Sequence, residues 1–67
     1  MIHGLDIYVS ELFDTDLMIY SDGKDYELRE NNVIILVGSY EVVLAEFNRL
    51  SAELERKEDL YFFKHYN

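Results

Sequence analysis

The stretch VIILVGSYEVVLAEFNRLSAEL, residues 33–54, decides the fold. Its first five residues are β-branched or leucine, a composition typical of a strand that is buried on both faces. Gly38 ends this strand, and Ser39 is a suitable N-cap because its hydroxyl can accept a hydrogen bond from a backbone N–H of the first helical turn. After Ser39 the apolar residues recur at the spacings of one helical face. The stretch therefore predicts a buried strand at 33–37 and an amphipathic helix from about residue 40 to residue 57.

Three strand-like segments precede this stretch, at residues 5–13, 17–20 and 25–29. Side chains alternate between the two faces of a strand. In the first segment, the side predicted to face the core consists of Leu5, Ile7, Val9 and Phe13, and the opposite side of Asp6, Tyr8 and Ser10. In the third segment, Tyr26 and Leu28 are predicted to point inward. Residues 1–4 are predicted to be a short leader.

The joins between these segments carry turn residues. Asp14-Thr15-Asp16 predicts a turn, and Asp22-Gly23 predicts a hairpin whose two central residues both have positive φ. Asn31-Asn32 predicts a second tight turn, because Asn tolerates the left-handed region. The predicted fold is α+β: a single domain over residues 1–67, with an antiparallel meander of three to four strands packed against one long helix.

The aromatic segment LYFFKHY, residues 60–66, is compatible with two conformations. Its aromatic density, and Glu58-Asp59 before it, favour a last strand. A continued helix is nearly as compatible, because no Gly or Pro ends it. We predict a strand or extended segment.

The size of the chain raises the question of what supports its core. At 67 residues it is near the lower limit for one hydrophobic core, and small domains commonly need disulfides, a metal ion or a partner subunit. There is no Cys, and His3 and His65 are too far apart for the usual zinc-ligand spacing. We therefore expect no metal and no cofactor. With six Tyr and four Phe, we expect a well-packed aromatic core, association, or both, and we favour a homodimer.

Composition also restricts the class of function. A Cys-His or Ser-His-Asp site is not expected, because there is no Cys and no His near a candidate Ser. An EF-hand loop starting at Asp14 fails, because its fifth position is Met18. We therefore predict that the protein is not an enzyme. The longest apolar run is five residues, which predicts no membrane span and no signal peptide, and hence a cytoplasmic protein.

The net charge of −8 predicts the kind of partner. Such a surface repels nucleic acid and anionic membranes and attracts basic surfaces, and the six bases form no basic patch. Residues 1–30 hold eight acids and two bases, a formal −6, whereas residues 31–67 hold six acids and four bases, a formal −2. The charge is therefore concentrated on the predicted meander.

Carboxylates two residues apart on a strand share a face at a separation of about 6.6–6.8 Å. Asp25 and Glu27 are predicted to share the outward face of the third strand, with acidic turns at its ends. A row of fixed negative charges resembles a phosphate backbone and would attract a protein built to grip phosphates. The candidate partner-binding residues are Asp14, Asp16, Asp22, Asp25, Glu27 and Glu30 for charge, and Tyr8 and Tyr20 as exposed apolar anchors. The alternative is a solvated face that only provides solubility.

The hairpin resembles a segment of a known family. Met18, Asp22-Gly23-Lys24 and Tyr26-Glu27 are similar to a segment of small phage-encoded inhibitors of uracil-DNA glycosylase. The resemblance covers about ten of the 67 positions, and the helix and the aromatic tail lie outside it. It implies an acidic sheet-plus-helix protein that imitates DNA charge, acts as a dimer and captures a protruding side chain of the enzyme in an apolar pocket. The resemblance also implies that Asp22, Asp25 and Glu27 are contact residues.

Two functions are thus expected. The first is a phage-type inhibitor, acting in the host cytoplasm without turnover, that blocks the nucleic-acid site of a host defence or repair enzyme such as a CRISPR effector or a uracil-DNA glycosylase. Small acidic phage inhibitors that include anti-CRISPR proteins share this composition. Its partner would be a basic nucleic-acid-binding protein, with no direct contact to nucleic acid or membrane. The second is a self-associating protein–protein interaction module whose acids serve only solubility.

Overall fold

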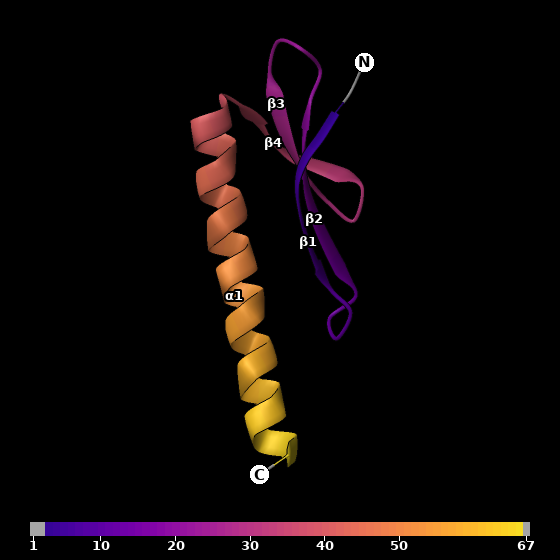
Figure 1. Ribbon diagram of the computed structural model, residues 1–67, viewed down its shortest axis with the longest axis vertical. Helices are drawn as coiled ribbons and strands as arrows, with labels where there is room; N and C mark the ends of the chain where they lie inside the picture. The colour runs from indigo at the N-terminus through magenta and orange to yellow at the C-terminus, as the bar shows by residue number, and fades with distance from the viewer. Residues whose placement is uncertain (1–2, 67) are drawn as a thin grey trace.

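A computed structural model describes the backbone of residues 3–66 and the side chains of residues 6–65 (Figure 1). Four strands precede one helix: β1 (His3–Ser10), β2 (Thr15–Ser21), β3 (Tyr26–Glu30), β4 (Val33–Gly38) and α1 (Tyr40–Tyr66). The strands lie in the order β1-β2-β3-β4, each antiparallel to its neighbour in the chain. The predicted α+β meander with one long helix is confirmed.

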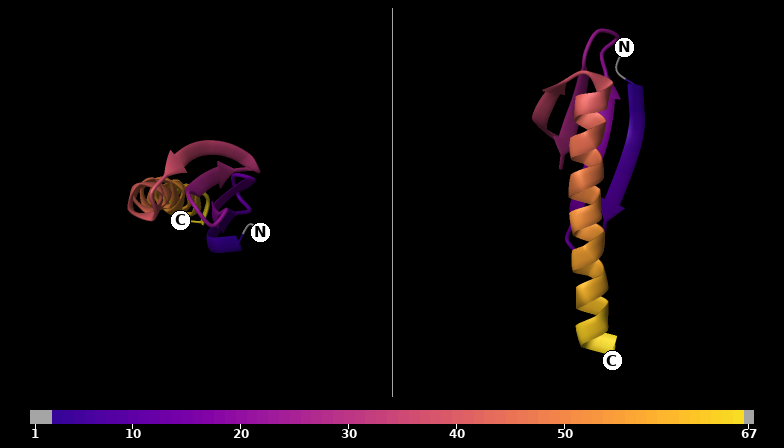
Figure 2. Two further views of the ribbon diagram at one scale, coloured as in Figure 1. Left: turned by 90° about the horizontal axis from the view of Figure 1, so that it is seen from above. Right: turned by 90° about the vertical axis from the view of Figure 1, so that its left-hand side faces the viewer.

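The helix lies along one face of the sheet and continues past the end of the β1–β2 hairpin (Figures 1 and 2). Its 27 residues span about 40 Å at the usual rise per residue. The principal extents of the molecule are 47, 18 and 16 Å, and its radius of gyration is 13.5 Å, against about 11 Å for a compact domain of this length. The molecule is therefore elongated, and the last turns of α1 stand beyond the sheet.

A small core fills the space between the sheet and the first half of α1. Its buried apolar members come from two central strands and from one face of the helix, and they are Leu17, Ile19, Leu28, Val43 and Phe47. Ile19 and Leu28 are register partners on β2 and β3, and Val43 and Phe47 are four residues apart on α1. Register partners share one face of a sheet, and residues four apart share one face of a helix. The two pairs therefore lie on surfaces that face each other. The core is thus confined to one layer between β2, β3 and α1.

Of the four predictions for the turns and the helix cap, two are confirmed and two are wrong. Asn31 (φ 50°) and Asn32 (φ 69°) both adopt the left-handed region, as predicted. The Asp22-Gly23 prediction is wrong in its geometry, because only Gly23 has a positive φ (94°). The carboxylate of Asp22 instead accepts hydrogen bonds from the backbone of the two residues after Gly23, which delays the start of β3 to Tyr26. The turn predicted at residues 14–16 lies at residues 11–14, and Thr15 and Asp16 belong to β2. Ser39 caps the helix through Val42 N–H at 3.4 Å, as predicted.

β1 turns the opposite side toward the helix from the one predicted. Ile7 is 61% exposed and Val9 is 51% exposed, whereas Ser10 is 1% exposed. The polar side faces inward because Asp6 and Tyr8 both form hydrogen bonds to helix side chains, and an irregularity between Gly4 and Asp6 shifts the register of the strand. The predicted leader is also wrong in part, since residues 3 and 4 belong to β1, whereas residues 1 and 2 lie outside the described residues.

Two further predictions, one for β4 and one for residues 60–66, are corrected. β4 is not buried on both faces: it is an edge strand, Val33 is 63% exposed, and only Leu36 packs partly on the core. One helix cannot cover both sides of an edge strand. The segment 60–66 is helical and not extended, because nothing stops α1 before it, and Lys64 and His65 in the last turn interact favourably with the helix dipole.

Candidate interaction surfaces

The predicted partner-binding acids lie in two groups at opposite ends of β2. We call the first the Asp16 group: it contains the predicted residues Asp14, Asp16 and Glu30, together with Glu11 of the same turn, which was not among the predicted residues. We call the second the Asp22 group, which consists of Asp22 and Asp25. Six residues separate Asp16 from Asp22 along an extended chain, which corresponds to about 20 Å. The acids therefore do not form one continuous row.

The backbone holds the Asp16 group in place. Asp14 donates its N–H to the carbonyl of Glu11 (3.3 Å) in the β1–β2 turn. Asp16 donates its N–H to Asn31 Oδ1 (2.8 Å) and accepts the N–H of Asn31 (2.9 Å), so the two turns at this end are joined. All four side chains are exposed, and within the described residues none of the four carboxylates forms an ion pair. This end of the sheet carries uncompensated negative charge on a fixed frame.

The carboxylate of Asp22 is engaged by its own loop. Its Oδ1 accepts the N–H groups of Lys24 (2.9 Å) and Asp25 (2.8 Å). Backbone donation from Asp25 and then from Lys24 lowers the pKa of Asp22, because both bonds favour the ionised form. The carboxylate is thus held ionised, while Asp25 beside it is exposed. The Asp22 group remains available as a second, smaller acidic site.

Glu27 does not continue the acidic row that the sequence predicted. It forms an ion pair with Arg29, in which Nε donates to Oε1 of Glu27 at 2.8 Å and the second guanidinium nitrogen also donates. The guanidinium carbon of Arg29 lies 4.4 Å from the centre of the Tyr20 ring. Tyr20 is consequently half-buried rather than an open anchor. The centre of the sheet's free face is therefore neutral.

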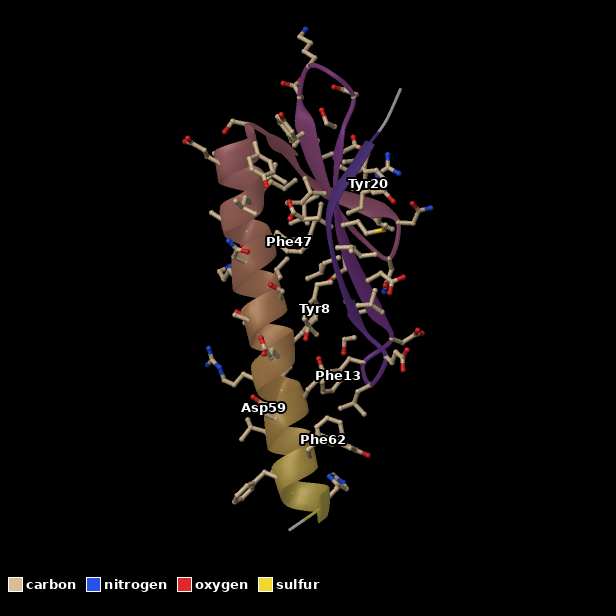
Figure 3. All side chains as sticks on the ribbon, in the orientation of Figure 1. Tyr8, Phe13, Tyr20, Phe47, Asp59 and Phe62 are labelled. Carbon is tan, nitrogen blue, oxygen red and sulfur yellow. The ribbon has the colours of Figure 1, made fainter. Side chains whose placement is uncertain are left out.

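Tyr8, the other predicted anchor, is a contact inside the molecule. Its ring points from β1 toward α1, whereas Tyr20 lies on the side of the sheet away from the helix (Figure 3). The Tyr8 hydroxyl donates to Glu58 Oε1 at 2.6 Å. This bond, followed by partial burial and the nearby negative charge, raises the pKa of Tyr8 to about 12. The prediction that Tyr8 is exposed for partner binding is corrected.

Three of the six acids of the helix are engaged by side chains, in contrast to the Asp16 group. Arg49 donates to Glu46 (2.5 Å) and to Glu53 (2.9 Å), and Glu58 accepts from Tyr8. The Arg49 guanidinium lowers the pKa of Glu46. Free negative charge is thus stronger at the ends of the sheet than along the middle of α1.

Two apolar surfaces were missed by sequence reasoning. One is the face of the sheet opposite α1, where Ile7, Val9, Ile34 and Val37 are exposed. The other is the end of the helix beyond the sheet, where Leu60, Tyr61, Phe62 and Phe63 are exposed and the Tyr61 ring stacks on His65 (4.0 Å between centres). The alternation in β1 showed that its apolar residues share a face, but it did not show that this face is uncovered.

What the described residues offer a partner is charge and apolar surface. Among the described side chains, those of residues 6–65, no three from His, Asp or Glu lie close enough together to hold a metal ion. Within residues 3–66 no helical segment is both long and apolar enough to cross a bilayer. No family model, no curated protein and no solved structure matches this chain.

Proposed function

We propose that this protein is a non-enzymatic, acidic inhibitor that binds the nucleic-acid site of a DNA- or RNA-processing enzyme by charge mimicry. The observation that carries the proposal is the Asp16 group, in which four exposed carboxylates without ion pairs are held on a rigid sheet end. A surface lined with Lys and Arg for gripping phosphates attracts such a group, since the same electrostatic term dominates nucleic-acid binding.

The two acidic groups fit contact at two points of an extended basic surface. Their separation of about 20 Å corresponds to about six base steps of one strand at 3.4 Å per step. Between them the ion pair of Glu27 and Arg29 leaves a neutral centre. The target would therefore contact the ends of the sheet, and we no longer place Glu27 among the charge contacts. The resemblance at Asp22-Gly23-Lys24 favours a phage-encoded inhibitor of a host defence or repair enzyme.

The test uses two matched double variants. Asp14→Asn/Asp16→Asn removes two charges from the Asp16 group, and Asn is suited to position 14 because Asp14 has a φ of 51°. Glu46→Gln/Glu53→Gln removes two charges from the helix, where both carboxylates are held by Arg49. Each purified protein is titrated into a CRISPR effector nuclease and a uracil-DNA glycosylase, and inhibition is measured at low and moderate salt.

The proposal predicts inhibition of at least one enzyme, weakened steeply by salt. The sheet-end double variant should weaken it at least 10-fold, and the helix double variant less than 3-fold, on the scale of exposed charge contacts. Equal losses from the two variants would mean that only net charge matters. Unchanged inhibition by the sheet-end variant would remove the Asp16 group from the contact.

A second candidate is an interaction module that binds through apolar surface, with acids that only provide solubility. It is favoured by the uncovered apolar residues on the sheet and at the end of α1. Salt discriminates the two, because an apolar interface barely responds to ionic strength whereas a charge-mimicry complex weakens.

A further inference from the structure

On the face of the sheet opposite α1, neighbouring side chains form two rows that run across the strands. The first row spans all four strands, and the second spans β2, β3 and β4. In the first row Ile7 pairs with Met18, Met18 with Arg29, and Arg29 with Ile34. In the second, Tyr20 pairs with Glu27 and Glu27 with Val37. Beside the first row, at the edge of this surface, Val9 pairs with Asp16 of the Asp16 group. We call this surface the outer face, and apart from Asp16 its members are Ile7, Val9, Met18, Tyr20, Glu27, Arg29, Ile34 and Val37.

The centre of the outer face carries no net charge, although the chain as a whole carries −8; the carboxylate of Asp16, the register partner of Val9, lies at its edge. Its two charged members, Glu27 and Arg29, form an ion pair with each other, and Arg29 lies over the Tyr20 ring. Both charged side chains are half-buried among the surrounding apolar groups. The face is therefore an apolar surface with a self-neutralised centre, bordered by the acidic groups at its ends.

Such a face is unusual for a sheet that meets water. An antiparallel sheet with one solvated face normally has polar side chains there, and exposed apolar patches on this scale mark interaction sites. Here β1 places Ile7 and Val9 outward and its polar side inward. The outer face also combines Tyr, Met and Arg, three residue types that are enriched in protein–protein interfaces.

We infer that a second copy of this chain covers the outer face, so that two sheets pack face to face in a dimer. The chain exposes 4926 Å². A compact monomer of 8.0 kDa exposes about 4,450 Å². The excess of about 470 Å² belongs to the elongated chain as a whole, that is, to the uncovered outer face and to the part of α1 beyond the sheet.

Charge favours a second copy over a basic partner as the occupant. A basic protein is drawn to the Asp16 group and the Asp22 group, whereas two chains of −8 can approach only where neither presents net charge. A twofold axis through the outer face makes the contact self-complementary and closed. The paired sheets would lie about 10 Å apart, the usual spacing of a sandwich. The dimer also enlarges a core that has only five buried apolar residues among those described.

The test is the mass of the full chain in solution, by light scattering and sedimentation at about 100 µM, a concentration that populates complexes of micromolar affinity. We expect twice the mass of 8.0 kDa for the wild type. Ile7→Lys and Val37→Lys should each return it to one copy. Val42→Lys and Phe63→Lys, exposed apolar positions on α1, should remain dimeric. Far-UV circular dichroism verifies folding. If Ile7→Lys fails to fold, Ile7→Thr keeps the β-branched side chain and should also weaken the dimer.

A wild-type chain that stays monomeric at this concentration would overturn the inference. So would a dimer that Phe63→Lys dissociates and Ile7→Lys leaves intact, because the helix end would then be the interface. Loss of enzyme inhibition by Ile7→Lys in a monomeric protein would assign the outer face to the target instead. The mass is measured without any target, so the dimer and the proposed inhibition can fail independently of each other.

Discussion

The hydroxyl of Tyr8 donates a 2.6 Å hydrogen bond to Glu58, which lies fifty residues later in the chain. The bond joins β1 to the second half of α1. A reciprocal bond runs from the Tyr40 hydroxyl, at the start of α1, to Asp6 Oδ2 at 2.9 Å. Each contact pairs a tyrosine hydroxyl with a carboxylate. In the first the strand supplies the tyrosine and the helix the carboxylate, and in the second the roles are exchanged. Together they explain why the polar side of β1 faces inward.

Tyr8→Phe tests the first contact. It keeps the ring and removes the donor to Glu58, so we expect the free energy of unfolding to fall by about 1 kcal/mol. Tyr61→Phe is the matched control, because Tyr61 is exposed on the part of α1 beyond the sheet, and it should change stability by less than about 0.5 kcal/mol. Urea denaturation followed by circular dichroism provides both values. Equal effects from the two variants would show that the Tyr8 bond contributes nothing specific.

Alkaline pH should destabilise the folded chain through the same contact. The pKa of Tyr8 is raised from 10.0 to about 12, so the folded chain keeps a proton that the unfolded chain releases near pH 10. The contribution of this bond is therefore complete below pH 10 and is lost as the pH rises from 10 toward 12. The pKa of Tyr40 is raised too, by its bond to Asp6, and it acts in the same direction. Urea midpoints measured across this range should fall more steeply for the wild type than for Tyr8→Phe; parallel curves would contradict the assignment.

Core truncation should be severe because the core is small. Ile19→Ala removes a fully buried side chain whose register partner is Leu28, and we expect a loss of about 2–5 kcal/mol. A domain of this length has a total stability of only about 3–10 kcal/mol. Val33→Ala, at an exposed end of β4, should cost less than about 0.5 kcal/mol. Thermal and urea unfolding compare the two. A mild Ile19→Ala variant would mean that the core lies elsewhere.

The β3–β4 turn should be sensitive to the left-handed conformation of Asn32 (φ 69°). Asn32→Ala should lower stability by about 1 kcal/mol, because an alanine side chain is strained in this region, whereas Asn32→Gly should not. Asn48→Ala is the control, since Asn48 is exposed on the helix and Ala favours helix. Unfolding midpoints of the three variants check the order. Loss of stability in Asn32→Gly as well would show that the Asn32 side chain, and not its backbone, matters.

The features that the sequence predicted well are those determined by neighbouring residues. The left-handed pair Asn31-Asn32, the Ser39 cap and the helical periodicity after residue 40 all act within a few positions. The order of the strands followed from the turns between them. These local signals therefore established the α+β meander, whose antiparallel strand order is confirmed.

The features that it missed depend on distant contacts. Alternation in β1 grouped Ile7 with Val9, but the inward side was decided by the bonds of Asp6 and Tyr8 to the helix. The apolar composition of β4 predicted burial, although burial of an edge strand depends on what lies beside it. In the same way, the ion pair that neutralises Glu27 could be foreseen only from the shared face of Glu27 and Arg29, which the acidic pattern obscured.

The connection of each strand to its chain neighbour has a consequence for the order of folding events. The three hairpins and the helix require only short-range closure, which is fast and carries a small entropic penalty. The Tyr8–Glu58 contact instead closes a loop between residues that are 50 positions apart in the 67-residue chain. We expect the sheet and the first half of α1 to assemble early, and the docking of the helix against β1 to complete the folded state. The contact between β1 and the second half of α1 would then also be the first to open when the protein begins to unfold.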